Sequence, residues 1–108
     1  MKHLPYRATT TTGTALDINF PLHPDTASAV TVAQLLDSVL RTLSREIAVL
    51  PHVANGDILQ ALAMALAVRT GIIHAPFALT AGETRKLLES ALNAMAEAEP
   101  HGPTPGRA

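Results

Sequence analysis

The side chains best suited to acid–base or metal chemistry are five histidines, and three of them fall at junctions between expected helices and strands. His23, His52 and His74 each lie near a proline or the end of an expected helix. No pair of histidines has the spacing by which two imidazoles on one helix hold a zinc ion. We therefore expect surface or capping histidines, and a metal site or proton-transfer pair is the less favoured alternative.

Two polar residues interrupt helical patterns that are otherwise apolar. Glu46 falls on the apolar side of an expected helix, near Leu35 and Val39. A carboxylate there pairs with a base such as Arg69, lies at the solvent edge of the core, or serves as an acid or base. Gln60 raises the same question, because a buried amide needs hydrogen-bond partners. Its candidates are the backbone of the amino-terminal strand, its own copy across a dimer axis, and a ligand.

If the chain has a ligand site, its candidate residues are Glu46, Gln60 and one of His52 or His74, and we expect it between two subunits. The sequence contains no cysteine, which excludes a thiolate metal site and a cysteine nucleophile. It also lacks a phosphate-binding glycine loop and the residue order of a serine hydrolase. We therefore assign no catalytic residue, no metal ligand and no cofactor.

A helix over residues 57–70 is expected to position these candidates, and it is the most apolar stretch of the chain. Between Ile58 and Val68 only Gln60 is polar, so this helix needs neighbours on several sides. The run is too short to cross a bilayer, which takes about 20 apolar residues. Alanine strips between the bulky side chains let other helices approach closely, from this chain or from a second copy.

Local signals predict where the helices begin and end. Asn55 is expected to cap the central helix, and Gly71 to end it in a left-handed conformation. Capping boxes at residues 31–34 and 80–83 predict the starts of the first and third helices. The apolar residues 72–79, which a proline interrupts, are expected to form an extended connection.

Residues 14–22 alternate between apolar and polar side chains, which is the pattern of a half-buried strand. Gly13 marks either a turn between two strands or a bulge in one long strand. Because only helices follow, this segment has no strand partner beyond itself, and an isolated hairpin is marginally stable. We therefore expect a homodimer, formed through the amino-terminal strand and apolar helix faces.

These patterns predict an α+β fold: an amino-terminal strand or hairpin over residues 6–20, then three α-helices packed around the apolar helix at residues 57–70. A single globular domain is expected over residues 1–99. The composition of residues 100–108 predicts a disordered tail.

Charge and composition narrow the classes of function. The net charge is −1 without a basic cluster, and only three residues are aromatic, so we expect no nucleic-acid partner. No secretory signal is apparent, so we expect a soluble cytoplasmic protein. The favoured function is a non-catalytic accessory or protein-interaction protein that acts as a homodimer and can have a further protein partner. The alternative is a small-molecule-binding protein or small enzyme with its site at the subunit interface.

Overall fold

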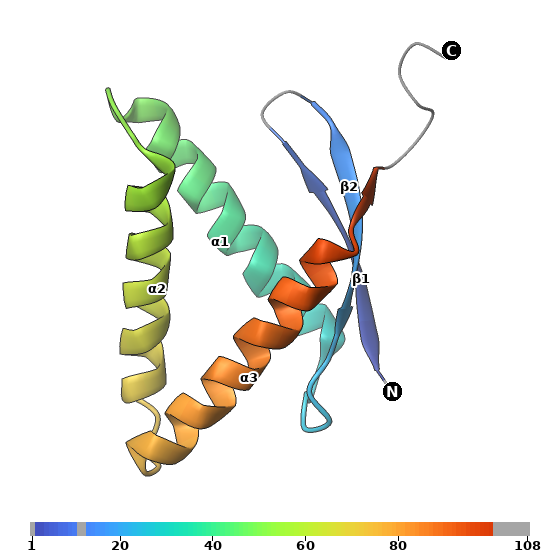
Figure 1. The fold of residues 1–108 in the computed structure, drawn as a ribbon, viewed down its shortest axis with the longest axis vertical. Helices are drawn as coiled ribbons and strands as arrows, with labels where there is room; N and C mark the ends of the chain where they lie inside the picture. Colours follow the sequence, from blue (N-terminus) through green and yellow to red (C-terminus); the bar gives the residue numbers. More distant parts are fainter. Residues whose placement is uncertain (1, 11–12, 101–108) are drawn as a thin grey trace. The chain divides into compact units, whose positions relative to one another are not determined.

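The computed structural model describes residues 2–10 and 13–100 of the chain (Figure 1). The elements follow in the order β1 (His3–Thr9), β2 (Ala15–Pro21), α1 (Ala29–Val49), α2 (Asn55–Gly71), α3 (Phe77–Ala96) and β3 (Glu99–Pro100). The predicted α+β fold with three helices is confirmed, and the amino-terminal segment is a hairpin rather than one long strand.

The chain divides into two compact units. Unit 1 contains the sheet, the start of α1 up to Ala33 and the end of α3 from Leu87. Unit 2, Gln34–Lys86, contains the rest of α1, all of α2 and the start of α3. The single domain over residues 1–99 therefore stays a prediction. Of the predicted tail, Pro100 lies in β3, and residues 101–108 lie outside the described part of the chain.

The turn of the hairpin depends on a glycine. The Thr10 amide donates to the Thr14 carbonyl at 2.8 Å, and the Gly13 amide donates back to the Thr10 carbonyl at 3.0 Å. Gly13 has a φ of +89°, a conformation that a side chain makes costly and that no other described residue adopts. The glycine thereby permits the antiparallel pairing that aligns Tyr6 with Ile18.

The hairpin has one apolar and one polar face, as the alternating pattern predicted. Ile18 is 5% exposed, and the rings of Tyr6 and Phe20 lie 6.4 Å apart on the same face. Asp17 and Asn19, on the other face, are exposed. The strand is therefore half-buried.

A third strand pairs with the hairpin, although the sequence showed no strand partner for it. In β3, Glu99 lies opposite Asp17 and Pro100 opposite Leu16, so β2 is central in a three-stranded antiparallel sheet. Two residues carry no alternating pattern, and this strand was therefore missed.

Prolines stand at outward-facing positions on both sides of the hairpin. The Leu22 amide donates to the Lys2 carbonyl, which makes this a hydrogen-bonded pair. Hydrogen-bonded and outward-facing pairs alternate in an antiparallel ladder, so the pairs at His3–Pro21 and Pro5–Asn19 direct their backbone groups away from the partner strand. Pro5 and Pro21 therefore cost the hairpin no hydrogen bond, and each removes a donor that an incoming strand would need.

The first helix begins earlier than predicted. α1 starts at Ala29, and the Ser28 hydroxyl accepts a hydrogen bond from the Thr31 amide at 3.1 Å. The predicted cap at Thr31 is therefore wrong, because Ser28 offers an equally good capping oxygen three residues upstream.

The third helix also begins early, at Phe77, so residues 72–79 do not form one extended segment. The amides of Leu79 and Thr80 donate to the Pro76 carbonyl, which makes this proline part of the helix start, where its missing N–H is no loss. Thr80 lies inside the helix, with its hydroxyl donating to the Phe77 carbonyl at 3.2 Å. The predicted capping box at residues 80–83 is wrong.

Helix α2 forms where predicted, but both of its ends differ from expectation. The N-cap residue is Ala54, without a side-chain cap, and Asn55 is already helical. Gly71 is the last helical residue, and the right-handed residue that follows is Ile72, with a φ of −89°. Gly71 has no left-handed role here.

Replacing Gly13 by alanine should lower the free energy of unfolding by about 1–2 kcal/mol, because the side chain is forced into a left-handed conformation. Gly82→Ala is the matched control. A methyl group at this helical position meets no other atom within 4 Å, so about 0.5–1 kcal/mol of stabilisation is expected. Urea titration measures both, and equal effects of the two variants would contradict the turn geometry.

Removing the Ser28 hydroxyl should shorten α1 at its start. We expect Ser28→Ala to cost about 1 kcal/mol of stability, as loss of an N-cap does, and Thr31→Ala less than about 0.5 kcal/mol. Denaturant unfolding compares the two variants. A larger loss for Thr31→Ala would restore the cap at that position.

Candidate functional site

Glu46 lies beside an open groove in unit 2. The groove has a volume of about 380 Å³ and is lined by Ser38, Val39, Thr42, Leu43 and Glu46 of α1 and by Leu62 of α2. Glu46 is exposed, and no described residue forms an ion pair with it, so the predicted salt bridge to Arg69 is absent. The position of Glu46 agrees with the alternative in which this carboxylate lies at the solvent edge of an apolar surface.

Gln60 is exposed on α2. Its amide makes no hydrogen bond to another described residue of unit 2. Its neighbours on the helix are Leu59, directly before it, and Met64, one turn after it, and these side chains are 67% and 57% exposed. The three expected partners of Gln60 stay predictions: the backbone of the amino-terminal strand, a second copy and a ligand.

His52 and His74 are exposed and lie at opposite ends of α2. His52 belongs to the connection before this helix and His74 to the connection after it. The helix between them has 17 residues and is about 26 Å long. Within one chain, these histidines therefore do not meet in one site.

His23 takes part in the turn before α1. Its Nδ1 atom accepts a hydrogen bond from the Asp25 amide at 3.0 Å. His23 therefore stabilises a turn and not the end of a helix. Among the described residues, no group of three or more His, Asp or Glu side chains is arranged to hold a metal ion.

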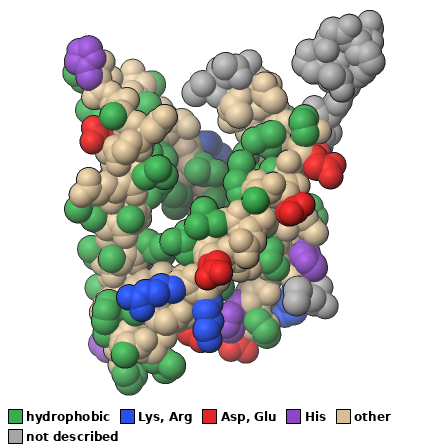
Figure 2. Space-filling view, in the orientation of Figure 1, with side chains coloured by type: hydrophobic (Ala, Val, Ile, Leu, Met, Phe, Trp, Pro, Cys, Tyr) green, Lys and Arg blue, Asp and Glu red, His purple; other side chains and the backbone are tan. Residues whose placement is uncertain are grey.

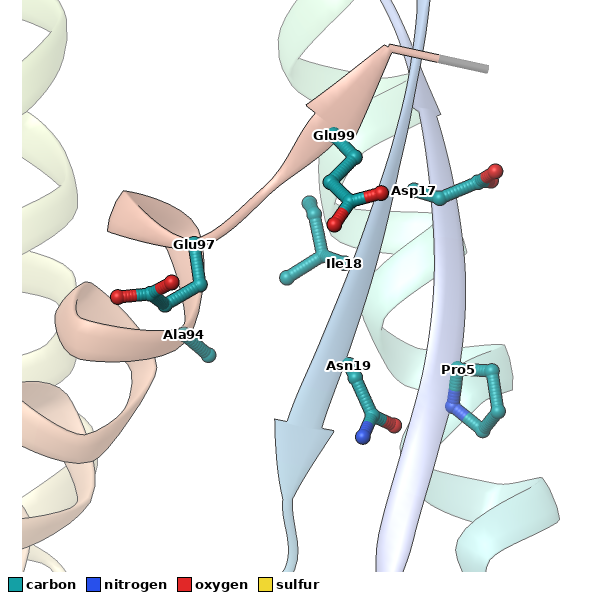
Figure 3. Close-up of a pocket in the computed structure, with 7 residues that line it drawn as sticks. All are labelled: Pro5, Asp17, Ile18, Asn19, Ala94, Glu97 and Glu99. Carbon is teal, nitrogen blue, oxygen red and sulfur yellow. The ribbon is translucent and has the colours of Figure 1, made fainter. Parts of the chain in front are cut away.

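Unit 1 has a pocket of about 300 Å³ beside β2, where three carboxylates gather (Figure 3). Glu97 lies in the turn directly after α3, Glu99 lies in β3, and Asp17 comes from β2. Figure 3 shows the three carboxylates pointing in different directions. The Asp17 carboxylate forms a salt bridge with Arg7, in which Nε of Arg7 donates to Oδ1 of Asp17 at 3.0 Å. These side chains do not converge on a single atom, so the pocket offers no catalytic or metal-binding geometry.

The most unusual surface of the molecule is apolar and belongs to unit 2. Thirteen large hydrophobic side chains there are between 37% and 75% exposed. We call them the unit 2 apolar surface: Leu35, Val39, Leu40, Val49, Leu50, Leu59, Met64, Leu66, Val68, Ile72, Ile73, Phe77 and Leu79. Figure 2 shows hydrophobic side chains at the surface along α2. No described helix is long and apolar enough to span a membrane.

Helix α2 was expected at the centre of the fold, with neighbours from its own chain or from a second copy. Thr70 is its only buried residue within one chain. The Thr70 hydroxyl donates to the Leu66 carbonyl at 2.7 Å and lies 3.0 Å from the hydroxyl of Thr84 in α3. This corner, with Ala81, holds the only buried residues of unit 2. The all-round apolar pattern required neighbours for α2, but it did not show whether its own chain supplies them.

The chain matches no protein family model, and no curated protein and no solved structure is significantly similar to it.

Replacing Glu46 by glutamine should change the free energy of unfolding by less than about 0.5 kcal/mol, because an exposed carboxylate without a partner contributes little. Thr70→Val is the reference, and loss of its buried hydrogen bond should cost about 1–2 kcal/mol. Denaturant unfolding measures both variants. A loss above about 1 kcal/mol for Glu46→Gln would mean that the carboxylate has a partner in solution.

Proposed function

We propose that this chain is a small non-catalytic interaction protein that acts as a homodimer, with the unit 2 apolar surface as its interface. The observation that carries the proposal is the exposure of α2, which is apolar between Ile58 and Val68 except at Gln60. Extensive exposed apolar surface is typical of an interaction site in a stable protein.

Burial of the exposed side chains by a partner would contribute a large favourable free energy. Burying one such side chain completely contributes about 1.5–3 kcal/mol, so half-burial leaves roughly 1 kcal/mol each and on the order of 10 kcal/mol for the surface. A small protein has a total stability of about 5–15 kcal/mol. Covering this surface by association therefore decides whether unit 2 is stable.

The strands are less suitable for association than the helices. Edge-to-edge pairing needs free backbone donors along a strand, and Pro5 removes one from the outer side of β1. Beside it, Arg7 carries a charge at the same edge. We therefore assign the predicted dimer contact to the helix faces. A dimer contact through the amino-terminal strand is less favoured, because Pro5 and Arg7 lie at the free edge of β1.

The alternative function, a small-molecule site at the subunit interface, draws no support from the geometry of one chain. Glu46, Gln60, His52 and His74 are exposed, and α2 holds the two histidines apart. The alternative stays a prediction that requires the dimer. A further protein partner is likewise compatible with any apolar surface that the dimer leaves open.

The full-length chain should have twice its 11.3 kDa mass by light scattering, and its Tm should rise with protein concentration. Association stabilises the folded state by mass action, so a coupled dimer unfolds at a higher temperature when it is more concentrated. Light scattering and thermal unfolding over a hundredfold range of concentration make the comparison. A stable monomer with a constant Tm would contradict the proposal.

A further inference from the structure

We propose that the α2 helices of two copies pack antiparallel about a two-fold axis near Ala63, with the α1 helices flanking them. This inference rests on the proposed function, because it names the partner and the geometry of the same apolar surface. A two-fold interface brings the same surface of each copy together. The occupant of the exposed face of α2 is therefore α2 of a second copy.

The distribution of side chains selects α2 for the centre of the interface. Eleven residues, Ile58–Val68, carry no charge. Helix α1, by contrast, has a charged side with Asp37, Arg41 and Arg45, which are all exposed. A helix that is apolar all round belongs inside an assembly, and an amphipathic helix belongs at its periphery. This ordering puts the two α2 helices in the middle of a four-helix core.

The exposed side of α2 has a shape that can receive a helix. At about 100° per residue, Leu59 and Leu66 form one row and Met64 and Val68 form another. These four side chains are 40% to 67% exposed. Between the rows lie the small residues Gly56, Ala63 and Ala67. The larger side chains there are Gln60 and, at the end of the helix that contacts α3, the buried Thr70. A second helix over these small residues contacts the inner side of both rows.

Charge selects the antiparallel direction. Asp57 lies in the first turn of α2 and Arg69 in the last, at equal distances in sequence from Ala63. A parallel pair would set like charges at the same level, which costs free energy. An antiparallel pair centred on Ala63 sets Asp57 level with Arg69 of the partner subunit at both ends. The helix dipoles also favour this direction.

The available apolar area matches that of a stable dimer. Nine members of the unit 2 apolar surface lie on α1, on α2 or at Leu50 between them, and each is about half exposed. At roughly 100 Å² of apolar surface for a complete side chain, they supply about 450 Å². Interfaces of homodimers are about 65% apolar, which implies about 700 Å² per partner. Stable complexes bury about 800 Å² per partner.

Single cysteines test this geometry directly, because the chain has none of its own. Ala63→Cys should give a disulfide-linked dimer on mild oxidation, since a disulfide needs Cα atoms about 4.4–6.8 Å apart. Ala48→Cys is the matched control, an exposed alanine on the charged side of α1. We expect at least a tenfold higher cross-linked fraction for Ala63→Cys. Equal cross-linking of the two variants, or none for Ala63→Cys, would overturn the inference.

A second pair of variants tests the interface without cross-linking. Gln60→Glu brings two charges into the apolar strip near the axis and should weaken the dimer at least tenfold. Gln34→Glu makes the same chemical change at an exposed position of α1 and should leave the dimer unchanged. Light scattering during dilution measures both, and circular dichroism verifies their helix content. Unchanged dimerisation of folded Gln60→Glu would also overturn the inference.

The outcomes separate this inference from the proposed function. A wild-type dimer that resists Gln60→Glu and does not cross-link through Ala63→Cys would leave the homodimer intact but place its interface elsewhere. A wild-type chain that stays monomeric at every concentration would refute both. Retained dimerisation with efficient cross-linking at Ala63→Cys and loss of dimer in Gln60→Glu would support the antiparallel α2 pair.

Discussion

Burial of helix α2 is the constraint on which the rest of unit 2 depends. A helix that is apolar on every side gains its stability from neighbours, because its sequence offers water no polar face. One chain supplies a packed corner at Thr70 and Ala81, where α2 meets α3, and leaves Leu59, Met64 and Val68 more than half exposed. If the proposed dimer covers these side chains, folding and association of these helices belong to one equilibrium.

The two units differ in how much surface suitable for association they expose. In unit 1, apolar side chains such as Ile18 are confined to one face of the hairpin, and Pro5 and Pro21 remove donors from its outward-facing positions. Such edges resist pairing with other strands. In unit 2, no comparable protection exists, since charges are missing from Ile58 to Val68. The proposed dimer therefore uses the helices of unit 2 and not the strand edges of unit 1.

Much of the fold could be predicted from the sequence because its signals are local. Alternation around Ile18 predicted the half-buried strand, and apolar periodicity predicted the helices. Gly13 was compatible with both a hairpin turn and a bulge, so the hairpin itself could not be predicted. The predicted start of the first helix was wrong because two residues, Ser28 and Thr31, have side chains that can cap a helix. The strand at Glu99 was missed because two residues show no periodicity. The extent of exposure of α2 could not be predicted, because an apolar pattern indicates that a helix needs neighbours but not which chain provides them.

The candidate site residues were predictable as residue types but not as a site, because their distances depend on the helix between them. In one chain, α2 keeps His52 and His74 about 26 Å of helix apart. An antiparallel α2 pair reverses this relation, since the connection with His52 then lies at the same end as the connection with His74 of the partner subunit. Chemistry that uses both histidines therefore requires two copies. In the proposed dimer, a ligand site that involves both histidines would therefore lie between the two subunits.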